Sequence, residues 1–129
     1  MQPFKIIDQG LVFDASTAPA DRQACYFTSL AQLDSGTVLA GWQTGLTKHS
    51  PTNTIRIARS TDQAESWQGI PWEFETSLDG IPGSLAAAEM IEAEPGRLLL
   101  FSTWFDRSDP DRPLFNPETE GILRSRQIL

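Results

Sequence analysis

Apolar and polar residues alternate with a period of two along several short stretches of this chain, a pattern typical of half-buried β-strands. The segment from Thr54 to Arg59 alternates around two isoleucines, and a continuous apolar run within 97–104 indicates burial on both faces. The stretch 85–90 also has helical propensity. Together with the turn residues, the patterns predict β-strands at 4–13 (one strand or two short ones), 25–33, 37–42, 54–59, 67–74, 84–93, 97–104 and 121–129.

Turns that contain glycine separate the predicted strands at the spacing of β-hairpins. Asp34-Ser35-Gly36 and Glu94-Pro95-Gly96 both place Gly where a positive φ angle is needed. An internal repeat follows from two corresponding pairs of segments: 36–40 with 96–100, and 55–59 with 122–126. Four antiparallel strands in meander order form one propeller blade, and a repeat of this length fits such blades. The sequence therefore predicts one complete four-stranded unit and most of a second.

A polar run follows the third predicted strand and ends in a tryptophan. An Asp early in such a turn can accept hydrogen bonds from backbone N–H groups further along it. The run resembles the Asp-box of sialidases and related BNR-repeat propellers, whose pattern is Ser/Thr-x-Asp-x-Gly-x-Thr-Trp. Ser60, Asp62 and Trp67 match that pattern, Ser66 stands in for the Thr, and Ala64 occupies the Gly position. In the family this box is a structural turn between the third and fourth strands of a blade.

The resemblance implies an all-β fold of antiparallel four-stranded meander blades, as in a six-bladed sialidase-like β-propeller, of which this chain supplies about two. The single partial propeller domain, 1–129, divides into an N-terminal strand and loop at 4–22, a first blade at 23–75 and an incomplete second blade at 83–129. Because a propeller must close to protect its strand edges, we expect homo-oligomers through exposed edges. Three copies would supply six blades. A truncated product and a small independent two-sheet domain are the alternatives.

Sialidases carry an Arg in the first strand of the first blade and an acid/base Asp in the loop after the second strand. Tyr26 and Thr28 stand here where the family has the Arg and Pro of its first-strand motif, and the loop 43–53 contains no Asp or Glu. We therefore expect a sialidase-like fragment related to glycoside hydrolases, without independent catalysis, that retains carbohydrate binding. The alternatives are a glycosidase completed by oligomerisation and a structural or interaction protein with no ligand.

Weak catalytic candidates lie in two loops. His49 has a side chain whose ordinary pKa suits a general acid or base, and the alternative is a solvated loop histidine. Asp106, Asp109 and Asp111 follow the sixth strand of the repeat, and two carboxylates a few ångströms apart could support glycoside hydrolysis. Local pairing of these carboxylates with the loop's arginines is the alternative, with little net energy from each pair.

Four tryptophans invite the hypothesis of sugar stacking. Trp42 and Trp104 stand at equivalent ends of the second strand of each unit, where a propeller opens its loops, and Arg107 follows the latter. We name these three residues as the carbohydrate-binding candidates, with core packing as the alternative for the two rings. Trp67 is better explained as a core residue of the Asp-box.

The composition limits the remaining classes of function. A formal net charge of -7 argues against a nucleic-acid partner, which needs clustered Lys and Arg. No signal peptide is visible, and no apolar stretch approaches the ~20 residues of a membrane span, so we expect a cytoplasmic protein without a membrane partner. No zinc-ligand spacing or phosphate loop is present, so no cofactor or metal is expected. The single cysteine, Cys25, lies in an apolar run and is expected to be a buried, inert thiol.

Overall fold

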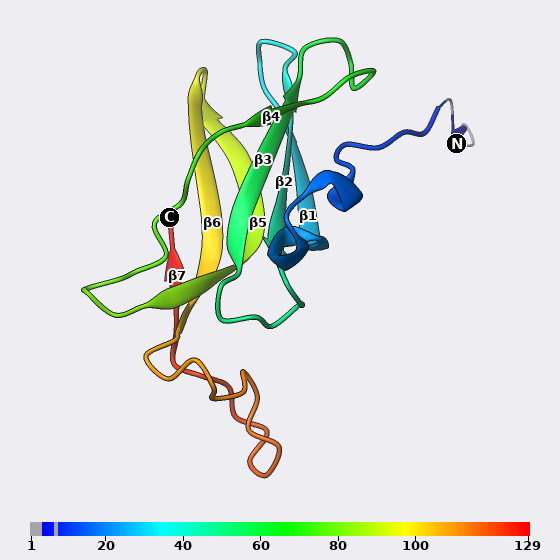
Figure 1. Cartoon of the computed structure of the whole chain (residues 1–129). Helices are drawn as coiled ribbons and strands as arrows, with labels where there is room; N and C mark the ends of the chain where they lie inside the picture. The colour runs from blue at the N-terminus through cyan, green and yellow to red at the C-terminus, as the bar shows by residue number, and fades with distance from the viewer. Residues whose placement is uncertain (1–3, 7) are drawn as a thin grey trace.

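The computed structural model describes residues 4–6 and 8–129, and it consists of two antiparallel β-sheets packed face to face (Figure 1). Two 3-10 helices, η1 (Ala15–Thr17) and η2 (Ala20–Arg22), precede the sheets. The first sheet is a four-stranded meander of β1 (Ala24–Gln32), β2 (Val38–Gly45), β3 (Thr54–Ser60) and β4 (Gln68–Ile70). The second sheet has three strands, β5 (Gly83–Glu94), β6 (Arg97–Asp106) and β7 (Ser125–Ile128). The predicted all-β class and the meander order of the first unit are confirmed.

Several predicted boundaries are wrong for identifiable reasons. No strand forms within the described part of 4–13, where Phe4 and Ile6 are almost fully exposed and no neighbouring strand pairs with them. The strand expected at 67–74 ends at Ile70, because Pro71 has no N–H to continue the ladder. The stretch 84–93 is a strand throughout, so tertiary pairing overrides its helical propensity. In the described residues, no helix has the length and apolar character to span a membrane.

The main core lies between the two sheets. The first sheet contributes Leu39, Ile55 and Ile57, and the second contributes Leu85 and Trp104. In β3 the isoleucines alternate with Thr54 and Arg56, which is the period-two pattern expected of a strand with one face on the core. A smaller cluster of Phe105, Leu114 and Leu123 lies under the long loop between β6 and β7.

The internal repeat is visible in the strand registers. Tyr26 pairs with Gln43 in the first sheet, and Ala86 pairs with Thr103 in the second; each pair is followed by a β-bulge. The third strands of the two sheets, β3 and β7, can then be aligned. Gln43 pairs with Ile55 and the corresponding residue Thr103 pairs with Gln127, so Ile55 corresponds to Gln127.

The expected correspondence between the segments 55–59 and 122–126 is therefore wrong, since Ile55 corresponds to Gln127. The loop after β6 is longer than the loop after β2, and its residues Leu114 and Leu123 share a backbone hydrogen bond of 3.0 Å inside the loop. That extra length delays the third strand of the second unit until Ser125.

The two sheets stack in the same orientation. Gly41 of β2 faces the second sheet, because a Cβ atom there would lie 3.2 Å from Cβ of Ala88. The residue at the same register position of the second sheet is Phe101, which is 44% exposed on the face that points away from the first sheet. The face of the first sheet that packs on the second sheet therefore corresponds to the face of the second sheet that points away from the first. Cys25, expected to be buried, is exposed on the outer face of the first sheet, beside residue 44 of β2.

Candidate functional site

The turn at 60–67, whose sequence resembles an Asp-box and which we call the Asp-box turn, is held by a set of side-chain hydrogen bonds. Ser60 Oγ donates to Asp62 Oδ1 at 2.7 Å and accepts from the backbone N–H of Ala64 at 2.9 Å. The backbone N–H of Ser66 donates to Asp62 Oδ1 at 3.0 Å, and the Ser66 hydroxyl donates to Oδ2. These bonds, above all those from the Ser66 and Ser60 hydroxyls, lower the pKa of Asp62 to about 2. The Asp62 carboxylate is therefore engaged within the turn.

Ala64 has a φ angle of 72°, and the residue before it, Gln63, has 61°. Ala64 thus occupies the left-handed conformation for which the Asp-box pattern has Gly. Trp67, expected in the core, is only half-buried and belongs to neither core cluster. It lies beside Arg59 and Gln68, whose side chains hydrogen-bond to each other at 3.0 Å and line the same small cavity.

The two tryptophans named for sugar stacking are covered in this structure. Trp104 is 1% exposed and donates from Nε1 to the carbonyl of Thr76 at 2.9 Å. Trp42 is 5% exposed on the outer face of the first sheet, where the Phe13 ring stacks on it with centroids 5.2 Å apart. Their positions are not equivalent, since the register aligns Trp104 with Thr44. Both rings pack against other parts of the chain, which is the alternative to sugar stacking.

The structure brings His49 and Arg107 together. Arg107 is 5% exposed and donates from Nε to Ser84 Oγ at 2.8 Å and from Nη2 to the His49 carbonyl at 3.1 Å. The His49 ring meets Phe115 edge to face, with centroids 5.3 Å apart. Partial burial lowers the pKa of His49, and the charges of Lys48 and Arg107 lower it further, which favours the neutral ring.

The carboxylates of the long loop serve local turns. Asp106 accepts from the backbone N–H and the hydroxyl of Ser108 at 2.9 and 2.7 Å, and these bonds lower its pKa. Asp109 accepts from the N–H of Asp111 at 3.2 Å. No Asp–Arg ion pair is formed by the described residues of this loop, and the charges of Arg124 and Arg112 add only after the Ser108 bonds to the lowering of the Asp106 pKa. Among the described residues, no three His, Cys, Asp or Glu side chains gather as metal ligands.

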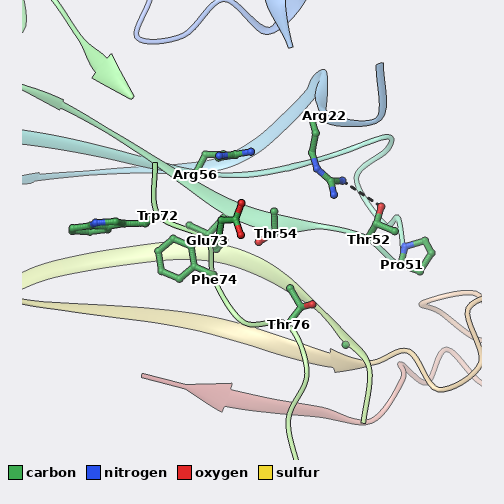
Figure 2. A pocket seen from close by; sticks show the side chains of 11 residues that line it. Arg22, Pro51, Thr52, Thr54, Arg56, Trp72, Glu73, Phe74 and Thr76 are labelled. Atoms are coloured by element: carbon green, nitrogen blue, oxygen red, sulfur yellow. Dashed lines mark hydrogen bonds between the residues drawn. The ribbon is translucent and has the colours of Figure 1, made fainter. Parts of the chain in front are cut away.

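A cavity lies elsewhere, beside the first half of β3. It has a volume of about 450 Å³, and Figure 2 shows its walls. One wall is the segment 72–76, and the other is formed by β3, η2 and the loop before β3. The residues that matter for its chemistry are Arg22, Thr52, Thr54, Arg56, Trp72 and Glu73. We call this cavity the β3 cleft.

Local structure explains why the β3 cleft is open. Because Pro71 ends β4, the residues of β3 that precede Ile57 have no strand beside them on that edge. The segment 72–76 leaves the sheet there and is anchored twice: Phe74 packs on the main core, and the Thr76 carbonyl accepts from Trp104. Trp72 and Glu73 project from this anchored segment (Figure 2).

Three side chains give the β3 cleft its chemical character. Trp72 is 51% exposed, so one part of its indole is free for contact. Arg56 and Glu73 form no ion pair with any described residue. Arg22, by contrast, lies 3.6 Å from Asp21 and 3.4 Å from the Thr52 hydroxyl.

Arg22 and Arg56 also line a second cavity, of about 330 Å³, on the side towards Phe13 and Trp42. Arg56 and Glu73 are not among the candidates named from the sequence for this cleft. Trp72 is counted there among the four tryptophans but is not named as a binding candidate. The sequence feature that points to this cleft is the dipeptide Pro71-Trp72. A proline inside a predicted strand ends the strand pairing there, so the Trp72 ring that follows does not pack in the sheet.

Comparison of the chain with protein-family models, with curated proteins and with solved structures finds no match.

Proposed function

We propose that this chain is a pair of sialidase-like blades that binds carbohydrate in the β3 cleft and has no catalytic activity of its own. The observation that carries the proposal is that the half-exposed Trp72 side chain and the unpaired guanidinium of Arg56 both line a cleft of about 450 Å³. Cavities of this size suit small ligands, and a few polar groups in them set orientation and specificity.

Two features support the blade character. The Asp-box bonds among Ser60, Asp62 and Ser66 form the turn between β3 and β4, as the resemblance implies. In addition, each sheet exposes a large apolar side chain on its outer face: Leu30 is 66% exposed on the first sheet and Phe101 44% on the second. Exposed apolar side chains on a sheet face are typical of a surface that packs against another layer.

The side chains of the β3 cleft match a sugar that carries a carboxylate. An indole face packs well against the C–H face of a pyranose ring, because it supplies a rigid apolar surface with a polar tip. A guanidinium binds a carboxylate bidentately, and Arg56 has no protein carboxylate to satisfy it among the described residues. Glu73 and Thr54 offer acceptors for sugar hydroxyls on the adjoining walls (Figure 2).

The catalytic candidates argue against turnover by this chain. The loop between β2 and β3 contains no carboxylate, and Tyr26 stands where sialidases have an Arg. Hydrogen bonds from Ser108 lower the pKa of Asp106, and a lowered pKa does not suit a general acid. We therefore place the function in binding.

The test is calorimetric titration of the protein with neutral and acidic mono- and oligosaccharides. We expect acidic sugars to bind, and Trp72→Ala to weaken binding by roughly 10- to 100-fold, or about 1.4 to 2.8 kcal/mol, as expected for loss of an aromatic anchor. Phe115→Ala is the matched control, since Phe115 is also 51% exposed but lies outside the cleft. Absence of heat with every sugar, or equal weakening by both variants, contradicts the proposal.

A further inference from the structure

We infer that the ligand of the β3 cleft is an acidic glycoside with an apolar aglycone, and that the aglycone occupies the second cavity, of about 330 Å³. We call this second cavity the Phe13 cavity, because Phe13 lines it and does not line the β3 cleft. The inference rests on the proposed function, since it extends the same site from an acidic sugar to an acidic sugar with an apolar group attached.

The β3 cleft and the Phe13 cavity share two residues, Arg22 and Arg56. Figure 2 shows both side chains on the same side of the β3 cleft. Arg22 donates from Nη1 to the Asp21 carbonyl at 3.1 Å and to the Thr52 hydroxyl at 3.4 Å, which leaves Nε and Nη2 without a partner among the described residues. Arg56 forms no ion pair with any described residue. A ligand carboxylate bound by these guanidiniums therefore lies at the boundary between the two cavities.

The first sheet fixes both arginines over its outer face. Arg56 on β3 pairs with Trp42 on β2, so their side chains stand next to each other on that face. Thr44 follows Trp42 by two residues and therefore points to the same face. Its hydroxyl donates to the Arg22 carbonyl at 2.6 Å, which ties the end of η2 to β2. The two arginines thus come from elements that the fold itself holds in place.

Away from the arginines, the walls of the Phe13 cavity are mostly apolar. The Phe13 ring is 39% exposed and stacks on Trp42 with centroids 5.2 Å apart. Ile70 and Pro71, at the end of β4, also line the cavity. An apolar cavity of ~150 Å³ holds a benzene ring, so a cavity of about 330 Å³ has room for a phenyl-sized group.

The hydroxyl groups on these walls are already engaged within the chain. Thr17 and Thr44 each donate from Oγ1 to a backbone carbonyl, at 2.7 and 2.6 Å. The Phe13 cavity therefore offers few partners to a sugar, whose hydroxyls each need one when they leave water. The β3 cleft differs, because Thr54 and Glu73 line it. The sugar therefore belongs in the β3 cleft, and the apolar aglycone belongs in the Phe13 cavity.

Binding in the Phe13 cavity needs the carboxylate as well as the apolar group. An apolar group there displaces water from the guanidiniums at the boundary, and a charge that is covered and left unpaired costs free energy. A carboxylate beside the aglycone pairs with Arg56 and removes this cost. A neutral glycoside with the same aglycone lacks that compensation, so the two cavities together favour an apolar group attached to an acidic sugar.

The test is calorimetric titration of the wild type with glucuronic acid, phenyl glucuronide, the neutral phenyl glucoside and phenylacetate. We expect phenyl glucuronide to bind roughly 10- to 100-fold more tightly than glucuronic acid, because the phenyl ring leaves water for an apolar cavity. Phenyl glucoside should bind roughly 10-fold or more weakly than phenyl glucuronide, since it lacks the carboxylate that pairs with the guanidiniums.

Three variants separate the two cavities. Phe13→Ala should remove most of the gain from the phenyl group and leave the binding of glucuronic acid as in the wild type, because Phe13 does not line the β3 cleft. Trp72→Ala should weaken glucuronic acid and phenyl glucuronide by the same factor, because Trp72 lines the β3 cleft and not the Phe13 cavity. Phe4→Ala, at an almost fully exposed ring of the same N-terminal segment, is the matched control and should bind every probe like the wild type.

Phenyl glucuronide that binds no more tightly than glucuronic acid, or a gain that Phe13→Ala retains, overturns this inference and leaves the sugar site of the proposed function standing. Failure of both glucuronic acid and phenyl glucuronide to bind contradicts the proposed function, and the inference falls with it. Phenylacetate has the carboxylate and the phenyl group without the sugar. Binding of phenylacetate that Phe13→Ala weakens and Trp72→Ala does not supports the Phe13 cavity as a site for apolar carboxylates.

Discussion

Phe27 in β1 and Ala87 in β5 occupy the same bulge of the two sheets, with φ angles of 51° and 63°. Left-handed backbone is costly for residues other than glycine, by roughly 1 to 2 kcal/mol. Its recurrence at one register position therefore marks the bulge as a property of the repeat. The bulges also join the sheets, because the hydroxyl of Ser29, just after the first bulge, donates to the carbonyl of Ala88 in the second.

Replacing Ala64 by Gly should stabilise the protein. Ala64 has a φ angle of 72° in the Asp-box turn, and Gly removes the steric cost of that conformation. We expect the free energy of unfolding to rise by about 1 kcal/mol, measured by urea denaturation. Gly36→Ala is the converse control: its φ angle is 85° with open space around it, so it should lose a similar amount. A neutral or destabilising effect of Ala64→Gly would show that the turn is not strained there.

The Asp62 carboxylate should make stability depend on acid pH. Its folded-state pKa of about 2 lies below the ordinary value of 3.8, so the group stabilises the folded protein above about pH 4. This contribution is lost as the pH falls from about 4 to about 2, because the unfolded chain then takes up the proton first. Asp62→Asn should be less stable than the wild type at pH 7, and the difference should shrink towards pH 2.

Ser66→Ala tests the cause of this shift, since the Ser66 hydroxyl is its largest contributor. In this variant the pKa of Asp62, measured by NMR titration, should move up towards 3.8. If wild type and Asp62→Asn lose stability in parallel between pH 5 and pH 2, the Asp-box carboxylate does not control the acid transition.

Arg107→Met should raise the pKa of His49. Burial is the main cause that lowers this pKa, and the positive charge of Arg107 adds to it, so removal of the charge moves the pKa back towards 6.5. The protein has one histidine, so a single imidazole signal in an NMR titration reports it. Arg112→Met, in the same loop, is the control and should leave the titration unchanged.

The same variant should also be less stable, by on the order of 1 to 3 kcal/mol, because Ser84 Oγ is buried and loses its guanidinium donor. An unchanged His49 titration in a folded Arg107→Met protein would show that the two side chains are not coupled.

The strands of the first sheet are predictable because their information is local. Alternation around Ile55 and Ile57 indicates β3, and the glycine at residue 36 indicates the first hairpin, without reference to any distant residue. Features that depend on distant parts of the chain are not predictable in this way. Trp42 is covered because the Phe13 ring packs on it. Trp72 is exposed because Pro71 ends the strand before it.

The candidate site shows the same division. His49 and Arg107 are separate candidates in the sequence, and only the packing of two loops brings them into contact. Arg56 alternates with buried isoleucines and looks, in the sequence, like any exposed residue of a strand. Its place in a cleft follows from the early end of β4, a tertiary consequence of one proline.

Gly83→Ala should damage the fold and the β3 cleft together. A Cβ atom at this position would overlap Nε1 of Trp104 and lie 2.7 Å from the carbonyl oxygen of Thr76. Since the hydrogen bond between those two residues anchors the segment 72–76, the substitution should cost about 1 to 3 kcal/mol of stability and weaken sugar binding through Trp72. Denaturant unfolding and calorimetric titration measure the two effects.

Two comparison variants separate steric overlap from loss of the hydrogen bond. Trp104→Phe removes the N–H donor from the buried ring, and should weaken sugar binding while costing more than the lost bond alone, because the smaller ring also leaves space in the core. Gly69→Ala lies on β4 with no atom near the added Cβ, so it should leave stability and binding close to those of the wild type. If Gly83→Ala binds sugar as the wild type does, the segment 72–76 does not depend on this anchor, and the position of Trp72 must be set by Phe74 and the core beneath it.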